Sequence, residues 1–377
     1  MNCATAVRRV GSRSLAAGSS PALGQVGQKK LFCSQPMQAI KTQVNVESQR
    51  HPLLDRFGRF HSYLRISLTE KCNLRCTYCM PEEGVPLTPK GRLMTLAELE
   101  RTVGIFAKLG VNKLRLTGGE PTLRKDLEEV IERLMAIEGI EAIAMTSNAV
   151  ALRRRLPKLI EAGLGQLNVS LDTLSEKKFE ILTRRRGFKQ VMRCIEEAES
   201  LVKPRLKLNC VVMRGINDDE AADFVELTKT RPLDVRFIEY MPFGGNQWST
   251  NRLVPYTELL ERIQNRHGQA MRLRDGPHDT SKAFMLPNAA GRFGFISSMT
   301  EHFCDGCNRV RLTADGNLKV CLHGESEVSL RDALRATTDD ALLEQLIAQA
   351  VGRKKRRHAG MEVLAQGSNR PMILIGG

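Results

Sequence analysis

The feature that most constrains the fold of this chain is an alternation of strand-like and helix-like segments that begins at Leu64. Short apolar runs predict strands at 64–69, 113–117, 142–146, 166–171, 206–213 and 235–240. Apolar residues at three- and four-residue spacing predict helices at 95–109, 123–135, 152–162, 188–201, 219–230 and 256–266, and a further helical run at 330–351. This alternation favours an α/β fold with a parallel sheet, and six such units fit a partial (βα)6 barrel. In parallel barrels the active site lies at the C-terminal ends of the strands.

The first expected strand ends in a loop with three cysteines, Cys72, Cys76 and Cys79, at C-x3-C-x2-C spacing. A four-iron cluster needs four ligands, so three thiolates leave one iron open for chemistry. A disulfide framework is disfavoured because three clustered cysteines cannot all pair and the chain is long enough to build a core. A zinc site is disfavoured because it usually shows paired C-x2-C units or a nearby histidine, and the nearest histidine, His61, precedes the strand.

The other expected strands also end in residues suited to ligand contacts. The second strand is followed by Gly118-Gly119-Glu120-Pro121, and two glycines at a strand end let the backbone approach a ligand closely. The later candidates are Thr146-Ser147-Asn148, Ser170-Leu171-Asp172, Lys207 and Glu239-Tyr240-Met241-Pro242. Helix capping is the alternative role for Ser147, Asn148 and Asp172. Solvent exposure is the alternative for Lys207, and core packing is the alternative for Met241.

A second cysteine triplet, Cys304, Cys307 and Cys321, has C-x2-C-x13-C spacing and again no obvious fourth cysteine. A second cluster with an open iron is one interpretation of this triplet. Because His302 and His323 flank it, a zinc site completed by histidine remains an alternative.

Charged and flexible segments surround this second triplet. Strand alternation would point Arg309 and Arg311 to the same side, and paired guanidinium groups suit phosphate binding. The basic run at 353–358 is interpreted as a solvated face or an anion-attracting patch. The run at 184–186 is expected in a solvated surface loop, and part of a phosphate-attracting rim is the alternative. The chain stops at Gly376-Gly377, which is flexible enough to enter a site.

Composition narrows the classes of function. The net charge of +15 suits nucleic acid, an acidic membrane surface or a polyphosphate ligand, but only 5% aromatic residues argues against single-strand stacking platforms. Six of the ten cysteines fall into the two triplets, which points to a reducing compartment. No apolar run approaches the length of a membrane span. Residues 1–46 contain no Asp or Glu and carry several Arg and Ser, which is typical of a transit peptide; a merely disordered tail is the alternative.

The motifs taken together resemble one family. The C-x3-C-x2-C loop, the G-G-E-P element one unit later, the C-x2-C-x13-C triplet and the final Gly-Gly resemble the radical S-adenosylmethionine (SAM) GTP 3′,8-cyclases, in a mitochondrial form, from about Arg56 to Gly377. The resemblance implies that a 5′-deoxyadenosyl radical abstracts the ribose 3′ hydrogen of GTP. The carbon radical then adds to guanine C8, giving (8S)-3′,8-cyclo-7,8-dihydroguanosine 5′-triphosphate in the first step of molybdenum cofactor (molybdopterin) biosynthesis.

The same resemblance assigns roles to individual residues. Cys72, Cys76 and Cys79 would hold a [4Fe–4S] cluster that binds SAM, and the SAM pocket would be lined by Tyr78, Gly119, Ser170 and Met241. GTP would be held by Arg65, Arg115, Thr146, Lys207, Arg309, Val310 and Arg311. Cys304, Cys307 and Cys321 would hold a second [4Fe–4S] cluster whose open iron binds guanine, and Gly376 and Gly377 would belong to the catalytic part with Arg309 and Arg311. Ala149, where many relatives have Gly, removes no ligand.

The resemblance also implies a domain organisation and partners. We expect a mitochondrial transit peptide at 1–46, a radical SAM partial barrel at 47–250 and a C-terminal α+β second-cluster domain with a tail at 251–377. The expected location is the mitochondrial matrix. The expected partners are GTP, cyclic pyranopterin monophosphate synthase as the next enzyme, an electron donor and a second copy in a homodimer, with neither nucleic acid nor a membrane span.

Two other classes of function stay open on the sequence alone. One is a radical SAM enzyme that modifies a peptide or protein and carries an auxiliary iron–sulfur cluster. The other is a non-enzymatic iron–sulfur or zinc protein that binds nucleic acid through its basic tail. The latter would need neither an open iron nor the G-G-E-P strand end.

Overall fold

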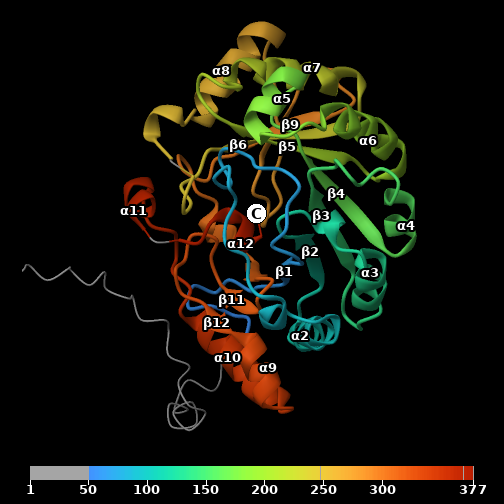
Figure 1. Ribbon diagram of the computed structural model, residues 1–377. Coiled ribbons are helices and arrows are strands. Elements are labelled where there is room, and N and C mark those ends of the chain that lie inside the picture. Colours follow the sequence, from blue (N-terminus) through green and yellow to red (C-terminus); the bar gives the residue numbers. More distant parts are fainter. Residues whose placement is uncertain (1–50, 247, 368, 377) are drawn as a thin grey trace, which may run out of the picture. The chain divides into compact units, whose positions relative to one another are not determined.

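The structure is a computed structural model that describes residues 51–376 except 247 and 368. The presequence predicted at 1–46 and Gly377 therefore lie outside the described residues. Within the described part, the strands form one twelve-stranded sheet in the order β12-β11-β10-β1-β2-β3-β4-β5-β6-β9-β8-β7 (Figure 1). No helix in this part of the chain has the length and apolar character needed to cross a bilayer.

The middle of the sheet is parallel from β10 to β9. These parallel strands are β1 (Tyr63–Ser67), β2 (Lys113–Thr117), β3 (Ala142–Ser147), β4 (Leu164–Ser170), β5 (Leu206–Val212), β6 (Leu233–Glu239), β9 (Arg292–Ile296) and β10 (Arg309–Leu312). The outer strands pair antiparallel and are β7 (Met271–Arg272), β8 (Lys282–Met285), β11 (Asn317–Lys319) and β12 (Val328–Ser329). The six strands expected from the alternation are thus confirmed, each with an end shifted by no more than a few residues.

The helices of the βα units cover the outer side of the strands, as Figure 1 shows for α3, α4 and α6 beside β3, β4 and β5. The helices are α2 (Leu96–Lys108), α3 (Leu127–Met135), α4 (Leu156–Glu161), α5 (Glu176–Thr183), α6 (Phe188–Leu201), α7 (Ala221–Thr230), α8 (Tyr256–His267), α9 (Leu330–Ala336), α10 (Asp340–Gly352), α11 (Met361–Gln366) and α12 (Met372–Ile375). Local chemistry sets their starts. At α2, Thr95 accepts a hydrogen bond from the Glu98 backbone while the Glu98 carboxylate accepts one from the Thr95 backbone.

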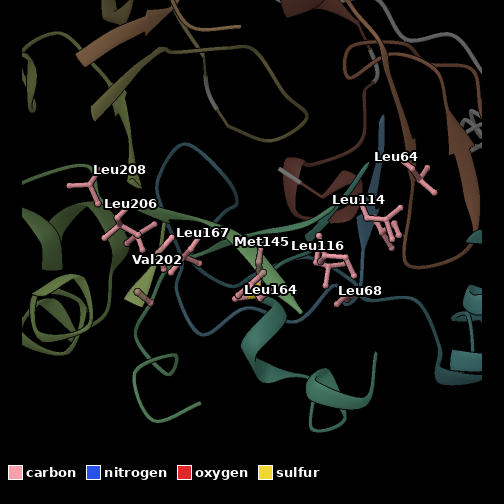
Figure 2. Packing of buried hydrophobic residues seen from close by; sticks show 14 of the residues in the cluster. Leu64, Leu68, Leu114, Leu116, Met145, Leu164, Leu167, Val202, Leu206 and Leu208 are labelled. Carbon is pink, nitrogen blue, oxygen red and sulfur yellow. The ribbon is translucent and has the colours of Figure 1, made fainter. Parts of the chain in front are cut away.

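The alternation within each parallel strand sends one set of side chains to the helices and the other set inward. Leu64, Leu114, Leu116 and Met145 belong to the first set, and Figure 2 shows them gathered from neighbouring strands. All four are fully buried in the main hydrophobic core. The intervening positions on the inner side are largely polar, which leaves an interior that suits a polar ligand.

Two features of the C-terminal part differ from the sequence expectation. The helical run predicted at 330–351 is two helices, α9 and α10, because Asp339 accepts a hydrogen bond from the Ala341 backbone and starts a new helix. In addition, β9 pairs with β6 and β10 pairs with β1, so one sheet continues across residue 250. The domain division near residue 250 stays a prediction.

Candidate active site

A single cavity of about 620 Å³ occupies the interior of the sheet and is lined by all six cysteines of the two triplets. The cavity also receives the inward-facing residues of the parallel strands. Most of the residues predicted for ligand contacts line it, namely Tyr78, Gly119, Ser170, Met241, Arg65, Arg115, Thr146, Lys207, Arg309 and Arg311. Val310 does not, because its side chain is fully buried in the hydrophobic core. The structure therefore brings the two cysteine triplets, which lie far apart in sequence, to one site.

The loop with the first triplet is held in place by the end of α5. The backbone N–H groups of Arg75 and Thr77 donate to the carbonyls of Thr183 and Leu182, at 2.9 Å each. The Arg184 guanidinium then donates to the carbonyls of Arg75 and Met80, both at 3.2 Å. The prediction that the run at 184–186 is a solvated loop is therefore wrong for Arg184, because its side chain turns inward to complete this loop.

The two glycines after β2 serve the packing of the same loop. A Cβ atom on Gly118 would lie 2.5 Å from the Thr69 carbonyl oxygen, and one on Gly119 would lie 2.3 Å from the Lys71 carbonyl oxygen. The Gly119 N–H donates to the Thr69 carbonyl at 2.7 Å. Only glycine allows the two backbones to lie this close, so the G-G-E-P element fixes where the cysteine loop sits.

Glu120, the third residue of that element, organises the neighbouring strand end. Its buried carboxylate accepts hydrogen bonds from the Ser147 hydroxyl at 2.7 Å and from the Asn148 backbone at 2.7 Å. The Asn148 amide in turn donates to Asn73 at 2.7 Å. Ser147 and Asn148 therefore connect the third strand to the cysteine loop, in addition to the local turn bonds they accept from Ala149 and Val150.

The three thiols of the first triplet are free and share a poorly solvated position. Burial raises the pKa of Cys76 well above its usual value, and the nearby Asp172, Cys79 and Cys72 raise it further. Burial, with Cys72, raises the pKa of Cys79 to about 12. Thiols that oppose one another's ionisation in this way are stabilised as thiolates by a bound metal cluster. The donor set therefore fits an iron–sulfur cluster.

Asp172 lies behind the first triplet and is paired with Tyr78. The Tyr78 hydroxyl donates to one carboxylate oxygen at 2.9 Å, and the Val211 N–H donates to the other at 2.8 Å. Burial raises the pKa of Asp172 to about 6 despite these two bonds. Asp172 is thus not a helix cap but an anchor for the tyrosine that lines the cavity.

Basic residues lie side by side across the middle of the cavity. Arg65 on β1 is in register with Arg311 on β10 and with Arg115 on β2. The row continues to Thr146 on β3, whose hydroxyl accepts a hydrogen bond from Arg115 at 3.2 Å. We call these three arginines the arginine row.

The arginine row and its neighbours are positively charged and poorly solvated. Burial lowers the pKa of Arg65 well below its usual value, and Arg311 and Arg115 lower it further. Burial, together with Arg236 and Arg115, lowers the pKa of Lys207 to about 7. A ligand with several negative charges would stabilise the charged forms of these side chains, because it offsets both their mutual repulsion and their loss of solvation.

Several cavity residues on the later strands were not predicted from the sequence. The row of register partners runs from Thr146 through Asn168, Lys207 and Asp234 to Arg292. In the described part of the chain, the amide oxygens of Asn168 and of Asn209, one layer further along, are buried without a hydrogen-bond partner. Asn168 and Asn209 could have been predicted from the sequence. Asn168 lies two positions from Ser170, and Asn209 lies two positions from Lys207, so each shares a face of its strand with a predicted site residue.

The second triplet lies beside the ends of β10 and β11, two of the C-terminal strands. Cys304 begins a short 3-10 turn, Cys307 precedes β10, and Cys321 follows β11. Burial raises the pKa of Cys304, with further contributions from Cys321 and Cys307. Burial would also raise the pKa of Cys307, but Lys354 and Arg309 outweigh it and lower this pKa to about 6. The three thiols are therefore neighbours in a partly basic environment.

The histidines that could complete a zinc site also line the cavity. His302 and His323 each have a buried Nδ1 atom without a hydrogen-bond partner in the described residues. However, no group of three or more His, Cys, Asp or Glu side chains within 51–376 is placed to hold a single metal ion. The choice between a cluster and a zinc site at this triplet therefore stays a prediction.

Comparison with known proteins agrees with this geometry. Residues 66–228 match the family model for the radical SAM superfamily, and residues 233–360 match the model for Molybdenum Cofactor Synthesis C. The crystal structure of Streptococcus suis SuiB bound to S-adenosylmethionine has a TM-score of 0.51 at 16% identity and covers 77% of this chain and 68% of that chain. At this identity the likeness concerns the fold alone. Fold, cysteine loop and family model together define a radical SAM protein, which implies a [4Fe–4S] cluster and SAM as cofactors.

Relatives in sequence narrow the class. The chain is 56% identical over 325 residues to the mitochondrial GTP 3′,8-cyclase of Arabidopsis thaliana, covering 86% of this chain and 83% of the relative. It is 41% identical over 311 residues to GTP 3′,8-cyclase of Desulforamulus reducens, covering 81% and 95%. It is 57% identical over 324 residues to molybdenum cofactor biosynthesis protein 1 of Mus musculus, but spans only 51% of that relative's length. The chain belongs to the GTP 3′,8-cyclase family.

Proposed function

We propose that this chain converts GTP to (8S)-3′,8-cyclo-7,8-dihydroguanosine 5′-triphosphate, the first step of molybdenum cofactor biosynthesis. The observation that carries the proposal is the arginine row, which lies in the one cavity that both cysteine triplets line. A site of this kind can hold a polyanionic substrate while each triplet contributes a metal cluster. A peptide substrate would not by itself call for several desolvated cations in a row.

Cys72, Cys76 and Cys79 would hold the first cluster, and Tyr78, Gly119, Ser170 and Met241 line the cavity beside them as the SAM pocket. When bound, this cluster supplies the electron that cleaves SAM into methionine and a 5′-deoxyadenosyl radical. The chain's own contribution is placement. Arg184 and the paired glycines fix the loop, and Asp172 fixes the Tyr78 ring.

Cys304, Cys307 and Cys321 would hold the second cluster, and its open iron would bind the guanine base. Arg309 precedes Arg311 on β10, and both side chains line the cavity on either side of Val310, which faces the core. A contact between Val310 and GTP would therefore come from its backbone. Because Arg309 and Arg311 follow Cys307 closely, a substrate held by this triplet lies within reach of both guanidinium groups.

The arginine row, Thr146 and Lys207 would receive the triphosphate and the ribose hydroxyls. Holding base and phosphates at two positions fixes the ribose between them, which supplies the orientation that an intramolecular carbon–carbon bond needs. Substrate bound in the cavity would keep water away from the radicals. C3′ would lose its hydrogen atom to the 5′-deoxyadenosyl radical, which becomes 5′-deoxyadenosine, and would bond to C8 of the same molecule. The unpaired electron left on the base would then be paired by one electron from the donor, and one proton would complete the 7,8-dihydro product.

The surrounding biology follows from the same proposal. GTP is the substrate, cyclic pyranopterin monophosphate synthase takes the product, and a separate electron donor reduces the clusters. The chain would act in the mitochondrial matrix after removal of residues 1–46, and as a homodimer. It would bind no nucleic acid.

The proposal is tested by anaerobic reconstitution with iron and sulfide, followed by incubation with SAM, dithionite and each nucleoside triphosphate in turn. We expect two four-iron clusters by iron analysis and Mössbauer spectroscopy. We also expect 5′-deoxyadenosine formation that GTP stimulates more than ATP, CTP or UTP. Stoichiometric zinc at the second triplet would exclude the second cluster, and SAM cleavage indifferent to GTP would exclude the cyclase.

A further inference from the structure

Lys354 belongs to the basic run at 353–358, yet its side chain is 4% exposed, whereas Lys355 and Arg356 are exposed. The run was interpreted from the sequence as a solvated face or an anion-attracting patch. For Lys354 the solvated face is wrong, because the chain after α10 turns the residue inward toward the second triplet. A buried lysine requires acceptors for its ammonium hydrogens.

The Lys354 ammonium has three hydrogens and three neighbours that can accept them. It lies 3.3 Å from Cys307 Sγ, 2.9 Å from the Arg309 carbonyl oxygen and 2.8 Å from His61 Nε2. The His61 Nδ1 atom lies 3.0 Å from the Leu53 carbonyl oxygen, which can only accept. Nδ1 therefore carries the hydrogen, and Nε2 is left as an acceptor for the ammonium.

The segment before β1 fixes this arrangement. The Arg59 guanidinium donates to the carbonyls of Cys304 at 2.6 Å, Lys355 at 2.9 Å and Arg356 at 2.7 Å. It also pairs with Asp55 at 2.6 Å. The Arg59 side chain thus joins the turn that begins at Cys304 to the segment that contains Lys354. The position of the Lys354 ammonium is set by its three hydrogen-bond acceptors and by the contacts of Arg59.

We propose that Lys354 is a positioning residue for the second cluster, whose ammonium, oriented by His61, holds the Cys307 sulfur and raises the reduction potential of that cluster. The inference rests on the proposed second cluster. A reduced cluster carries one more negative charge than an oxidised one, so a cation at a ligand sulfur favours reduction. Net charge and hydrogen bonds to the sulfurs are the means by which proteins tune such clusters. In the proposed reaction this cluster lies beside the base.

The test uses the full chain with Cys72, Cys76 and Cys79 all replaced by Ser, so that only the second cluster remains. The variants added to it are Lys354→Met, which removes the charge, Lys354→Gln, which keeps a neutral donor, and Lys354→Arg, which keeps the charge. Lys355→Met, at the adjacent exposed lysine, is the matched control. Each is reconstituted anaerobically and measured by iron content, thermal unfolding and redox titration followed by electron paramagnetic resonance.

Lys354→Met and Lys354→Gln should lower the equilibrium constant for reducing the second cluster by about tenfold, which is about 59 mV for one electron. Lys354→Arg and Lys355→Met should stay close to the parent. If the neutral variants lose iron, recovery of the iron in Lys354→Arg supports the proposal, and failure to recover it counts against it. Parental potential and iron content in either neutral variant overturn it. A parent without iron at this triplet would instead remove the proposed second cluster, a result visible before any Lys354 variant is made.

Discussion

The Arg311 guanidinium donates a hydrogen bond of 2.9 Å to the backbone carbonyl of Gly376, so the end of the described chain lies against the arginine row. Gly376 has a φ of +81°, and a Cβ atom there would lie 2.7 Å from Thr117 Oγ1 and 2.9 Å from Ser67 Cβ. Figure 1 shows α12, which precedes Gly376, inside the arc of strands. The tail therefore reaches the interior because glycine fits there and other residues do not.

This contact predicts that a chain ending at Ile375 loses GTP-dependent turnover. Arg311→Ala should lower turnover by roughly 10- to 150-fold, since one charge-assisted hydrogen bond is worth about 1.5–3 kcal/mol. Because the tail acts through Arg311, truncation should add little in the Arg311→Ala background. The measurement is anaerobic product formation with GTP.

Slow SAM cleavage without GTP should survive in both variants, because the first triplet is untouched. The control is Arg186→Ala, at an exposed arginine. Parental turnover and KM in Arg311→Ala would contradict the assignment of β10 to the substrate.

The glycines after β2 give a second prediction. Gly119→Ala places a methyl group 2.3 Å from a backbone oxygen of the cysteine loop, and neither backbone can move freely. We expect the variant to lose most of the iron of the first cluster and about 1–3 kcal/mol of unfolding free energy. Gly104→Ala, in α2 and with open space around the added methyl, should instead be neutral or stabilising by up to ~1 kcal/mol. Equal iron content in the two variants would argue against the packing role of Gly119.

The buried carboxylate of Asp172 predicts a pH dependence. Its pKa in the folded protein is about 6 against an ordinary value of 3.8, so ionisation costs stability above pH 6 and costs nothing below pH 3.8. Asp172→Asn should therefore gain stability relative to the parent as pH rises from 4 to 7, by at most on the order of 3 kcal/mol. Urea unfolding of the iron-free protein across this range measures the difference. If the stability difference between Asp172→Asn and the parent does not change with pH, ionisation of Asp172 does not destabilise the folded protein and the prediction is wrong. The control is Asp219→Asn, at an exposed carboxylate.

The composition of residues 1–46 predicts import and removal. A fluorescent protein fused behind this segment alone should enter mitochondria, because acid-poor, arginine-bearing segments are the ones that import recognises. A chain that begins at residue 47 should keep full turnover after reconstitution. Diffuse cytosolic fluorescence would contradict the prediction.

The features that local pattern encodes were predicted correctly. Short apolar runs placed β1 to β6, and apolar residues at three- and four-residue spacing placed α2 and α6. The cysteine triplets were recognised from spacing of a few residues. Each of these inferences uses residues that are neighbours in sequence, whose joint effect on backbone and side-chain direction is nearly independent of the rest of the chain.

By itself, then, the sequence determined most of the strand and helix pattern and the family, and it predicted the ligand sets. Only the tertiary structure decided that β10 lies beside β1, which puts Arg311 next to Arg65 across more than half the chain. It also decided that Lys354 in a basic run is buried, and that Arg184 turns toward the cysteine loop. Such outcomes depend on which surfaces meet after the chain has folded. A residue's own neighbours carry no record of a partner that lies hundreds of positions away.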